Sequence, residues 1–287
     1  MIPNDMEDFA NYFGSDAWNH YIYSKIILST TDIEPNYKKG DTNLLERNLQ
    51  KGNKRINLKK TIAIKMLSFL KILSRETDSF FLATYLPKLI QLNLELKLRQ
   101  TPQLRQSIPT SNTAIDLKQR QWIMKLDCRS AFEFFILSII AKQIPTLYLE
   151  GYKRLVLDVS NNGWPKRPKV IFTSNSETND DHFKTYAAEK IENGSKLIIG
   201  QHGGLYGMGL WSFTESHHLA ISDKYFSWGW TENNNPKIIP IGQLKMKRPK
   251  KNSLTSKSSI LLVTTALPRH SYHMYSAPIS SQWLEYR

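Results

Sequence analysis

Apolar residues follow different spacings in the two parts of the chain. Up to about residue 140 they recur every three to four positions, which is the spacing of amphipathic helices. Such stretches lie at 17–27, 58–73, 80–98 and 116–140, with a polar loop at 36–56. We therefore expect a mainly helical N-terminal region over residues 1–140.

Beyond residue 140 the pattern changes to short apolar runs separated by polar segments. Runs typical of strands lie at 169–174, 196–199, 219–230 (with a helix end) and 238–242, whereas 144–152 indicates an ordered loop or short strand. Asn179 or Asp180 can cap a helix that reaches Glu192 and ends at Gly194. Strand, helix and strand at this spacing predict parallel β-α-β units, so we expect an α/β domain over 141–245.

A polar, basic linker follows at 246–258, and a new strand then begins at Ser259. We interpret 259–287 as the start of a second α/β domain. One strand and part of a helix cannot close a core. Either this piece packs on the first domain or, as we favour, the chain is a truncated form of a longer protein.

Composition and charge limit the function classes. The single cysteine, Cys128, excludes an internal disulfide framework and a thiolate zinc site. The longest apolar run, 132–140, is too short to span a bilayer. Residues 51–125 hold 15 basic and 4 acidic side chains, which favours either a solvated lysine face or contact with an anionic membrane or a phosphorylated substrate. No nucleic-acid-binding pattern is present, so we expect no nucleic-acid partner.

The most informative segment follows the strand at 196–199. Five of the 13 glycines lie within 200–209, together with His202. Open α/β sheets bind ligands at the carboxyl ends of their strands, where glycines let the backbone approach a phosphate or a sugar. His202 can act near neutral pH as a base for an acceptor hydroxyl. The alternatives are a histidine that caps a turn and glycines that only form one.

Other polar residues leave several interpretations open. Glu215, His217, His218 and Asp223 could bind a metal, line a cleft or provide ordinary helix polarity, and we predict no metal site. Trp228 and Trp230 share one side of a strand, which favours packing over sugar stacking. Tyr148, Glu150 and Tyr152 are candidate acceptor contacts. No Gly-x-Ser-x-Gly motif supports a hydrolase.

Several of these motifs together resemble a family of bacterial transferases associated with O-antigen and other surface-polysaccharide synthesis. The matching runs are Lys169-Val-Ile-Phe-Thr-Ser-Asn-Ser-Glu177 continuing through Asp180-Asp-His-Phe-Lys184, Gly200-Gln-His-Gly-Gly-Leu-Tyr-Gly207, Ser222-Asp-Lys-Tyr-Phe-Ser-Trp-Gly-Trp230, Ile144-Pro145 with Tyr148-Leu-Glu-Gly-Tyr152, and the segment from Thr264 to Ser276. The resemblance covers about 115–287 well. Members of that family are roughly twice as long as this chain, so most of a second domain would be missing here.

The order of the motifs is also similar to two-domain B-type glycosyltransferases and to CDP-glycerol glycerophosphotransferases. That similarity implies a helical region followed by the parallel, Rossmann-like half of a B-type fold, with His202 as the catalytic residue in the interdomain cleft. It also implies acceptor or phosphate contacts from Gln201, Gly203, Gly204, Tyr206, Gly207, Glu215, His218 and Asp223, and donor contacts from Arg269, His270 and His273. Gly204 stands where the glycerophosphotransferases carry Thr-Pro, which favours sugar transfer.

The resulting hypothesis is a transferase that moves a sugar from a nucleotide-activated donor to a carbohydrate or lipid-linked acceptor. We expect no cofactor, a cytoplasmic location and a peripheral contact with the inner face of the membrane. The alternatives are a non-catalytic remnant that binds only the acceptor and a glycerophosphotransferase-like polymer synthase. With its donor half incomplete, we expect the chain to be inactive alone.

Overall fold

The computed structural model describes residues 2–13, 16–32, 73–121, 129–209, 212–232 and 234–245. Most of the helix expected at 58–73 therefore lies outside the described residues. The linker, the strand that begins at Ser259 and the donor residues Arg269, His270 and His273 also lie outside them.

A five-stranded, all-parallel sheet forms the centre of the structure, and its strands follow one another in chain order. They are β1 (Phe80–Phe81), β2 (Val170–Thr173), β3 (Lys196–Gly200), β4 (Lys224–Ser227) and β5 (Ile238–Pro240). The α/β class with a parallel, Rossmann-like half is therefore confirmed. The strands β2 to β5 lie where the apolar runs predict them, but β4 ends at Ser227. Trp228 and Trp230 therefore do not lie on a strand as expected, because the chain turns at Gly229, whose φ is 125°.

The first strand corrects one prediction. Residues 80–98 do not form a single helix: β1 occupies the start, and α5 (Lys88–Lys97) begins only after Pro87. Between the two, Ala83 and Tyr85 adopt positive φ angles of 48° and 59°, which a helix cannot contain. Phe80 is fully buried against the sheet, so tertiary packing overrides the helical spacing here.

The expected helix at 116–140 is also only partly formed. The backbone N–H groups of Lys118 and Gln119 donate to the carboxylate of Asp116, which forms a turn. The helix α6 (Ala131–Ile140) starts separately, where the Ser130 hydroxyl accepts from the Glu133 N–H. Near the N-terminus, α1 (Met6–Phe13) and α2 (Asp16–Thr30) are helical, and α2 confirms the helix expected at 17–27. The 144–152 segment is a loop around the 3₁₀ turn η2 (Thr146–Tyr148).

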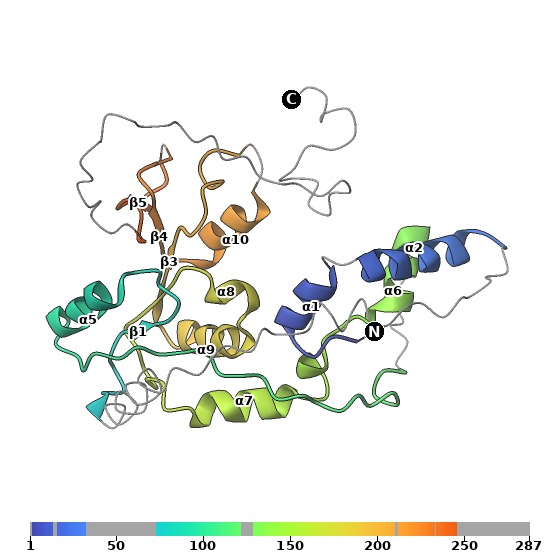
Figure 1. The fold of residues 1–287 in the computed structure, drawn as a ribbon, viewed down its shortest axis with the longest axis horizontal. Helices are drawn as coiled ribbons and strands as arrows, with labels where there is room; N and C mark the ends of the chain where they lie inside the picture. Colours follow the sequence, from blue (N-terminus) through green and yellow to red (C-terminus); the bar gives the residue numbers. More distant parts are fainter. Residues whose placement is uncertain are drawn as a thin grey trace, which may run out of the picture.

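Alternate residues of the strands face opposite sides of the sheet. Phe80, Ile171 and Leu197 are in register on one face, which packs against α7 (Tyr152–Asn161) and α9 (Asp181–Glu192) through Leu155 and Phe183. The other face is covered by α5 and by Leu244. Figure 1 shows α5 on one side of the strands, and α8 (Ser176–Asn179), α9 and α10 (Phe213–Ile221) on the other.

The absence of a side chain at Gly200 allows close packing on the face of the sheet that α5 and Leu244 cover. A Cβ atom at Gly200 would lie 2.5 Å from Leu244 and 2.8 Å from the Ser174 hydroxyl. Because Gly200 has no side chain, Phe172 of β2 and Phe226 of β4 meet across β3 with ring centres 5.6 Å apart. Among the described residues, no helix is both long enough and apolar enough to cross a membrane.

Candidate functional site

The residues that follow the strands gather at the carboxyl edge of the sheet. Ser174 and Asn175 follow β2, Gln201 and His202 follow β3, and Trp228 follows β4. In open α/β sheets, ligands bind outside the carboxyl ends of the strands. The predicted glycine loop therefore lies at the predicted edge.

Gln201 joins the glycine loop to the segment that follows β4. Its Oε1 accepts from the Trp228 N–H at 2.7 Å and from the Trp230 Nε1–H at 2.9 Å, while its Nε2 donates to the Gly203 carbonyl at 2.7 Å. The side chain is buried, and both ends of its amide are occupied. Gln201 thus holds the glycine loop and the Trp228–Trp230 segment in a fixed arrangement.

Gly207 holds the far end of the loop. Its φ is +75°, and a Cβ atom there would lie 2.5 Å from the ring of Trp230. Its N–H donates to Glu215 Oε2 at 2.5 Å, and Glu215 lies in the first turn of α10. The loop is therefore closed against both α10 and Trp230, whereas Gly204 is exposed with no neighbour close to it.

His202 is partly exposed at the centre of this edge. Its Nε2 lies 3.2 Å from the hydroxyl of Tyr206, and the two rings are 5.2 Å apart. Burial lowers the pKa of the His202 imidazole, and the nearby charge of Lys245 lowers it further, while Glu177 opposes the shift. The lowered pKa favours the neutral imidazole, which can accept a proton.

Behind His202 lies a buried pair that the sequence interpretation did not include as a pair. Glu177, in α8, approaches His218 of α10 to 2.7 Å between Oε1 and Nε2, and their side chains are only 3% and 0% exposed. The atoms are close but not aligned as a linear hydrogen bond. The ring of His218 lies 5.8 Å from that of His202.

Tyr85, in the loop after β1, borders His202 and is bonded to Asn175, which lies after β2. The Asn175 amide donates to the Tyr85 hydroxyl at 2.7 Å, and the Tyr85 ring lies 6.2 Å from that of His202. The ammonium group of Lys245 sits 3.8 Å from the centre of the Tyr85 ring. Sequence reasoning missed Tyr85, since it lay within the expected helix. Asn175 and Glu177 could have been found, because they directly follow a predicted strand.

The structure places the predicted catalytic residue, His202, together with most of the predicted acceptor or phosphate contacts, namely Gln201, Gly203, Gly204, Tyr206, Gly207, Glu215 and His218. Asp223 lies elsewhere. Its carboxylate accepts from the Leu197 N–H at the start of β3 and pairs with Lys196 at 3.0 Å, so it is at the amino edge of the sheet. Asp223 and His218 are thus at opposite ends of the sheet.

Two of the three candidate acceptor contacts around residue 150 form internal contacts, whereas the side chain of Tyr152 is exposed at the start of α7. Glu150 forms a buried, two-pronged ion pair with Arg120, and Tyr148 donates to Asp181 at 2.5 Å. Within the described part of the chain, no three His, Cys, Asp or Glu side chains are grouped to hold a metal ion.

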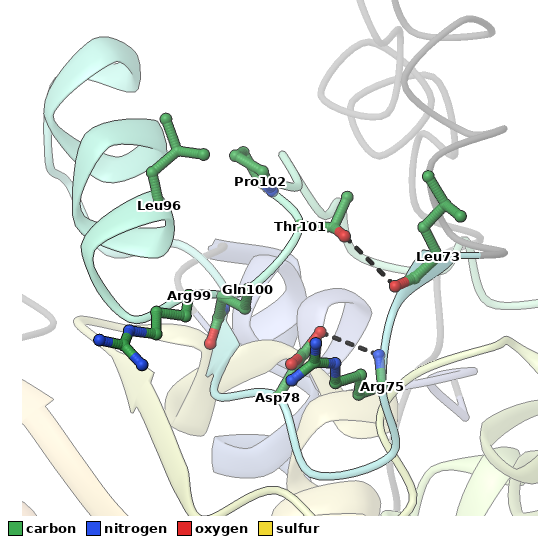
Figure 2. Close-up of a pocket in the computed structure, with 8 residues that line it drawn as sticks. All are labelled: Leu73, Arg75, Asp78, Leu96, Arg99, Gln100, Thr101 and Pro102. Atoms are coloured by element: carbon green, nitrogen blue, oxygen red, sulfur yellow. Dashed lines mark hydrogen bonds between the residues drawn. The ribbon is translucent and has the colours of Figure 1, made fainter.

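A separate pocket of about 410 Å³ lies at the amino end of β1. Figure 2 shows Arg75 and Asp78 facing Arg99 and Gln100 across it, with Thr101 bonded to the Leu73 carbonyl. Its buried polar groups have internal partners: Asp78 accepts from the Arg75 N–H, and Gln100 bonds both backbone groups of Ser79. The carboxyl edge, by contrast, presents a proton acceptor.

Comparison with known proteins identifies the family of the chain. The family model described as "LIC12162 family transferase" matches residues 1–287, which is the whole chain. No curated protein and no solved structure matches it. The match confirms the expected transferase class, whereas the role in O-antigen synthesis and the B-type glycosyltransferase fold stay predictions. The chain belongs to the LIC12162 family of transferases.

Proposed function

We propose that this chain carries the acceptor side of a transferase that moves a sugar from a nucleotide-activated donor to a carbohydrate or lipid-linked acceptor, with His202 as the general base. The observation that carries the proposal is the position of His202. It follows a central strand at the carboxyl edge of the sheet, is partly exposed, and is bordered by the glycine loop.

The chemistry follows from the charge state of His202. A neutral imidazole takes the proton of an acceptor hydroxyl as the hydroxyl oxygen attacks the anomeric carbon of the donor. A new carbon–oxygen bond forms, the bond to the donor phosphate breaks, and the nucleoside diphosphate leaves with its electron pair. In this proposal Arg269, His270 and His273 bind the donor phosphates, because an arginine fork suits a diphosphate.

The surroundings of His202 suit a polar acceptor. Asn175 and the hydroxyl of Tyr85 offer hydrogen-bonding groups, and Lys245 adds a positive charge over the Tyr85 ring. The excess of basic residues at 51–125 supports a peripheral contact with an anionic membrane, which would bring the enzyme to a lipid-linked acceptor.

The direct test is an assay of the complete protein against a panel of labelled nucleotide sugars, with a lipid extract of its own host as the acceptor source. We expect release of a nucleoside diphosphate and transfer of label to a saccharide or lipid. Consumption of CDP-glycerol alone would establish the glycerophosphotransferase alternative instead. Saccharide binding without nucleotide release from any donor would identify a binding module and overturn the proposal.

A further inference from the structure

Burying the Glu177–His218 pair carries a cost in folding free energy. Burying a carboxylate beside an imidazole loses the hydration of both, and such pairs do not in general stabilise a protein. Within the described residues, Glu177 Oε2 and His218 Nδ1 are buried without a hydrogen-bond partner. Buried polar atoms with no partner are uncommon and concentrate where a protein uses them. The pair therefore calls for a role beyond stability.

The pair lies next to His202. The rings of His202, Tyr206 and His218 form a triangle with centre-to-centre distances of 5.2, 5.6 and 5.8 Å. The Nδ1 atom of His202 is buried as well, and the backbone carbonyl of Ser174 lies near the imidazole. The exposed side of His202 thus faces the site, while two ionisable side chains lie behind it.

We propose that Glu177 and His218 are positioning residues for His202, and that their charges determine how readily its imidazole takes up a proton. The proposal rests on the proposed function of His202 as a base. Neither residue touches the substrate. The negative charge of Glu177 stabilises the protonated form of the His202 imidazole, whereas a positive charge on His218 destabilises it.

Among the residues that the structure describes, three other charged or titratable groups border His202. Tyr85 borders it from the loop after β1, Tyr206 from its own loop, and Lys245 from the segment after β5. Glu177 and the Ser174 carbonyl raise the His202 pKa, whereas burial, His218 and Lys245 lower it, burial having the largest effect. Glu177 and His218 therefore act in opposite directions on the same imidazole.

The test is an NMR titration of the His202 side chain in the chain described here. Replacement Glu177→Gln should lower the His202 titration midpoint, because an attractive negative charge is lost. Replacement His218→Gln should raise it, and the double variant should fall between the two. His217→Gln is the matched control: His217 is the exposed neighbour of His218, so the His202 midpoint should stay unchanged.

A second measurement needs no substitution that could unfold the protein. In the wild type, the chemical shift of His202 should depart from a single titration step, because two ionisable side chains lie behind its ring. A single-step titration of His202, or unchanged His202 midpoints in both folded variants, would overturn the proposal. Since the readout is a titration, it is independent of the activity assay. If the His202 midpoint responds to Glu177 and His218 but His202 is dispensable for transfer, only the proposed function is refuted.

Discussion

Gly207 lies against the indole ring of Trp230 so closely that a single methyl group at Gly207 would come within 2.5 Å of the ring. The backbone of Gly207 also adopts a left-handed φ of +75°. The glycine loop and the Trp228–Trp230 segment are therefore fitted to each other through a residue without a side chain. A substitution that adds one tests this fit.

The replacement Gly207→Ala should destabilise the protein by about 1–3 kcal/mol, because it adds backbone strain and displaces the Trp230 ring. Urea unfolding followed by tryptophan fluorescence would measure this. Gly204→Ala is the control, since Gly204 has no close neighbour and no positive φ, and it should change stability by less than about 0.5 kcal/mol. Equal effects of the two substitutions would contradict the described loop.

The amide of Gln201 should be important for stability, because it satisfies three groups at once. In Gln201→Met the Trp228 N–H and the Trp230 Nε1–H lose their shared acceptor while the side-chain volume is kept. We expect a loss of about 2–4 kcal/mol in the free energy of unfolding. Gln243→Met, at an exposed position nearby, should be close to neutral. A similarly small effect at Gln201 would show that the amide is not the link.

The Arg120–Glu150 pair should make the stability depend on pH in the acid range. The hydrogen bond from Arg120 lowers the pKa of the Glu150 carboxyl from 4.5 to about 2. A lowered pKa gives stability that is complete above pH 4.5 and is lost as pH falls toward 2. Urea unfolding between pH 6 and pH 2.5 should show a steeper loss in the wild type than in Glu150→Gln.

At neutral pH the Glu150→Gln change itself should cost about 3–5 kcal/mol, because it leaves the Arg120 charge buried without its partner. The exposed pair Arg154–Asp158 provides the control. Asp158→Asn should cost at most about 1 kcal/mol. If both substitutions have the same small effect, the Arg120–Glu150 pair is not buried as described.

The His202→Ala variant should slow transfer by roughly 10²–10⁴-fold while leaving the fold intact, because His202 acts on the reacting hydroxyl. Donor binding should change little. His217→Ala, on the exposed face of α10, should retain wild-type turnover. Because the pKa of His202 is lowered, the wild-type rate should fall only at pH values below about 6.5, the ordinary pKa of histidine. Near-normal turnover of the His202 variant would end its assignment as the base.

The sequence predicts the sheet well where apolar runs are short and bounded by polar residues. The strands β2 to β5 and the Asp180-capped helix α9 all have such local signals. The strand β1 has only two residues, and its neighbours Leu82 and Leu86 fit a helical spacing equally well. It is a strand because Phe80 and Phe81 pair with Ile171 and Phe172, and this contact is invisible to local patterns.

The candidate site also has one part that local sequence patterns predict and another part that they do not. The glycine loop and His202 are contiguous and follow a recognisable strand, so their place at the sheet edge could be predicted. The pairing of Glu177 with His218 depends on how α8 and α10 pack, and the contact of Tyr85 with Asn175 depends on β1. Such contacts join residues that are far apart in sequence, and neither spacing nor composition encodes them.

The pairing of β1 with β2 has a consequence for the order of folding. Phe80 pairs with Ile171 about 90 residues later, whereas Val170 pairs with Lys196 after about 26, and closing the longer loop costs about 1 kcal/mol more in chain entropy. We therefore expect β2 to β5 to assemble first and β1 to join last. Until β1 docks, the growing protein has the glycine loop in place but lacks Tyr85 beside His202, so the site is completed only in the last step of folding.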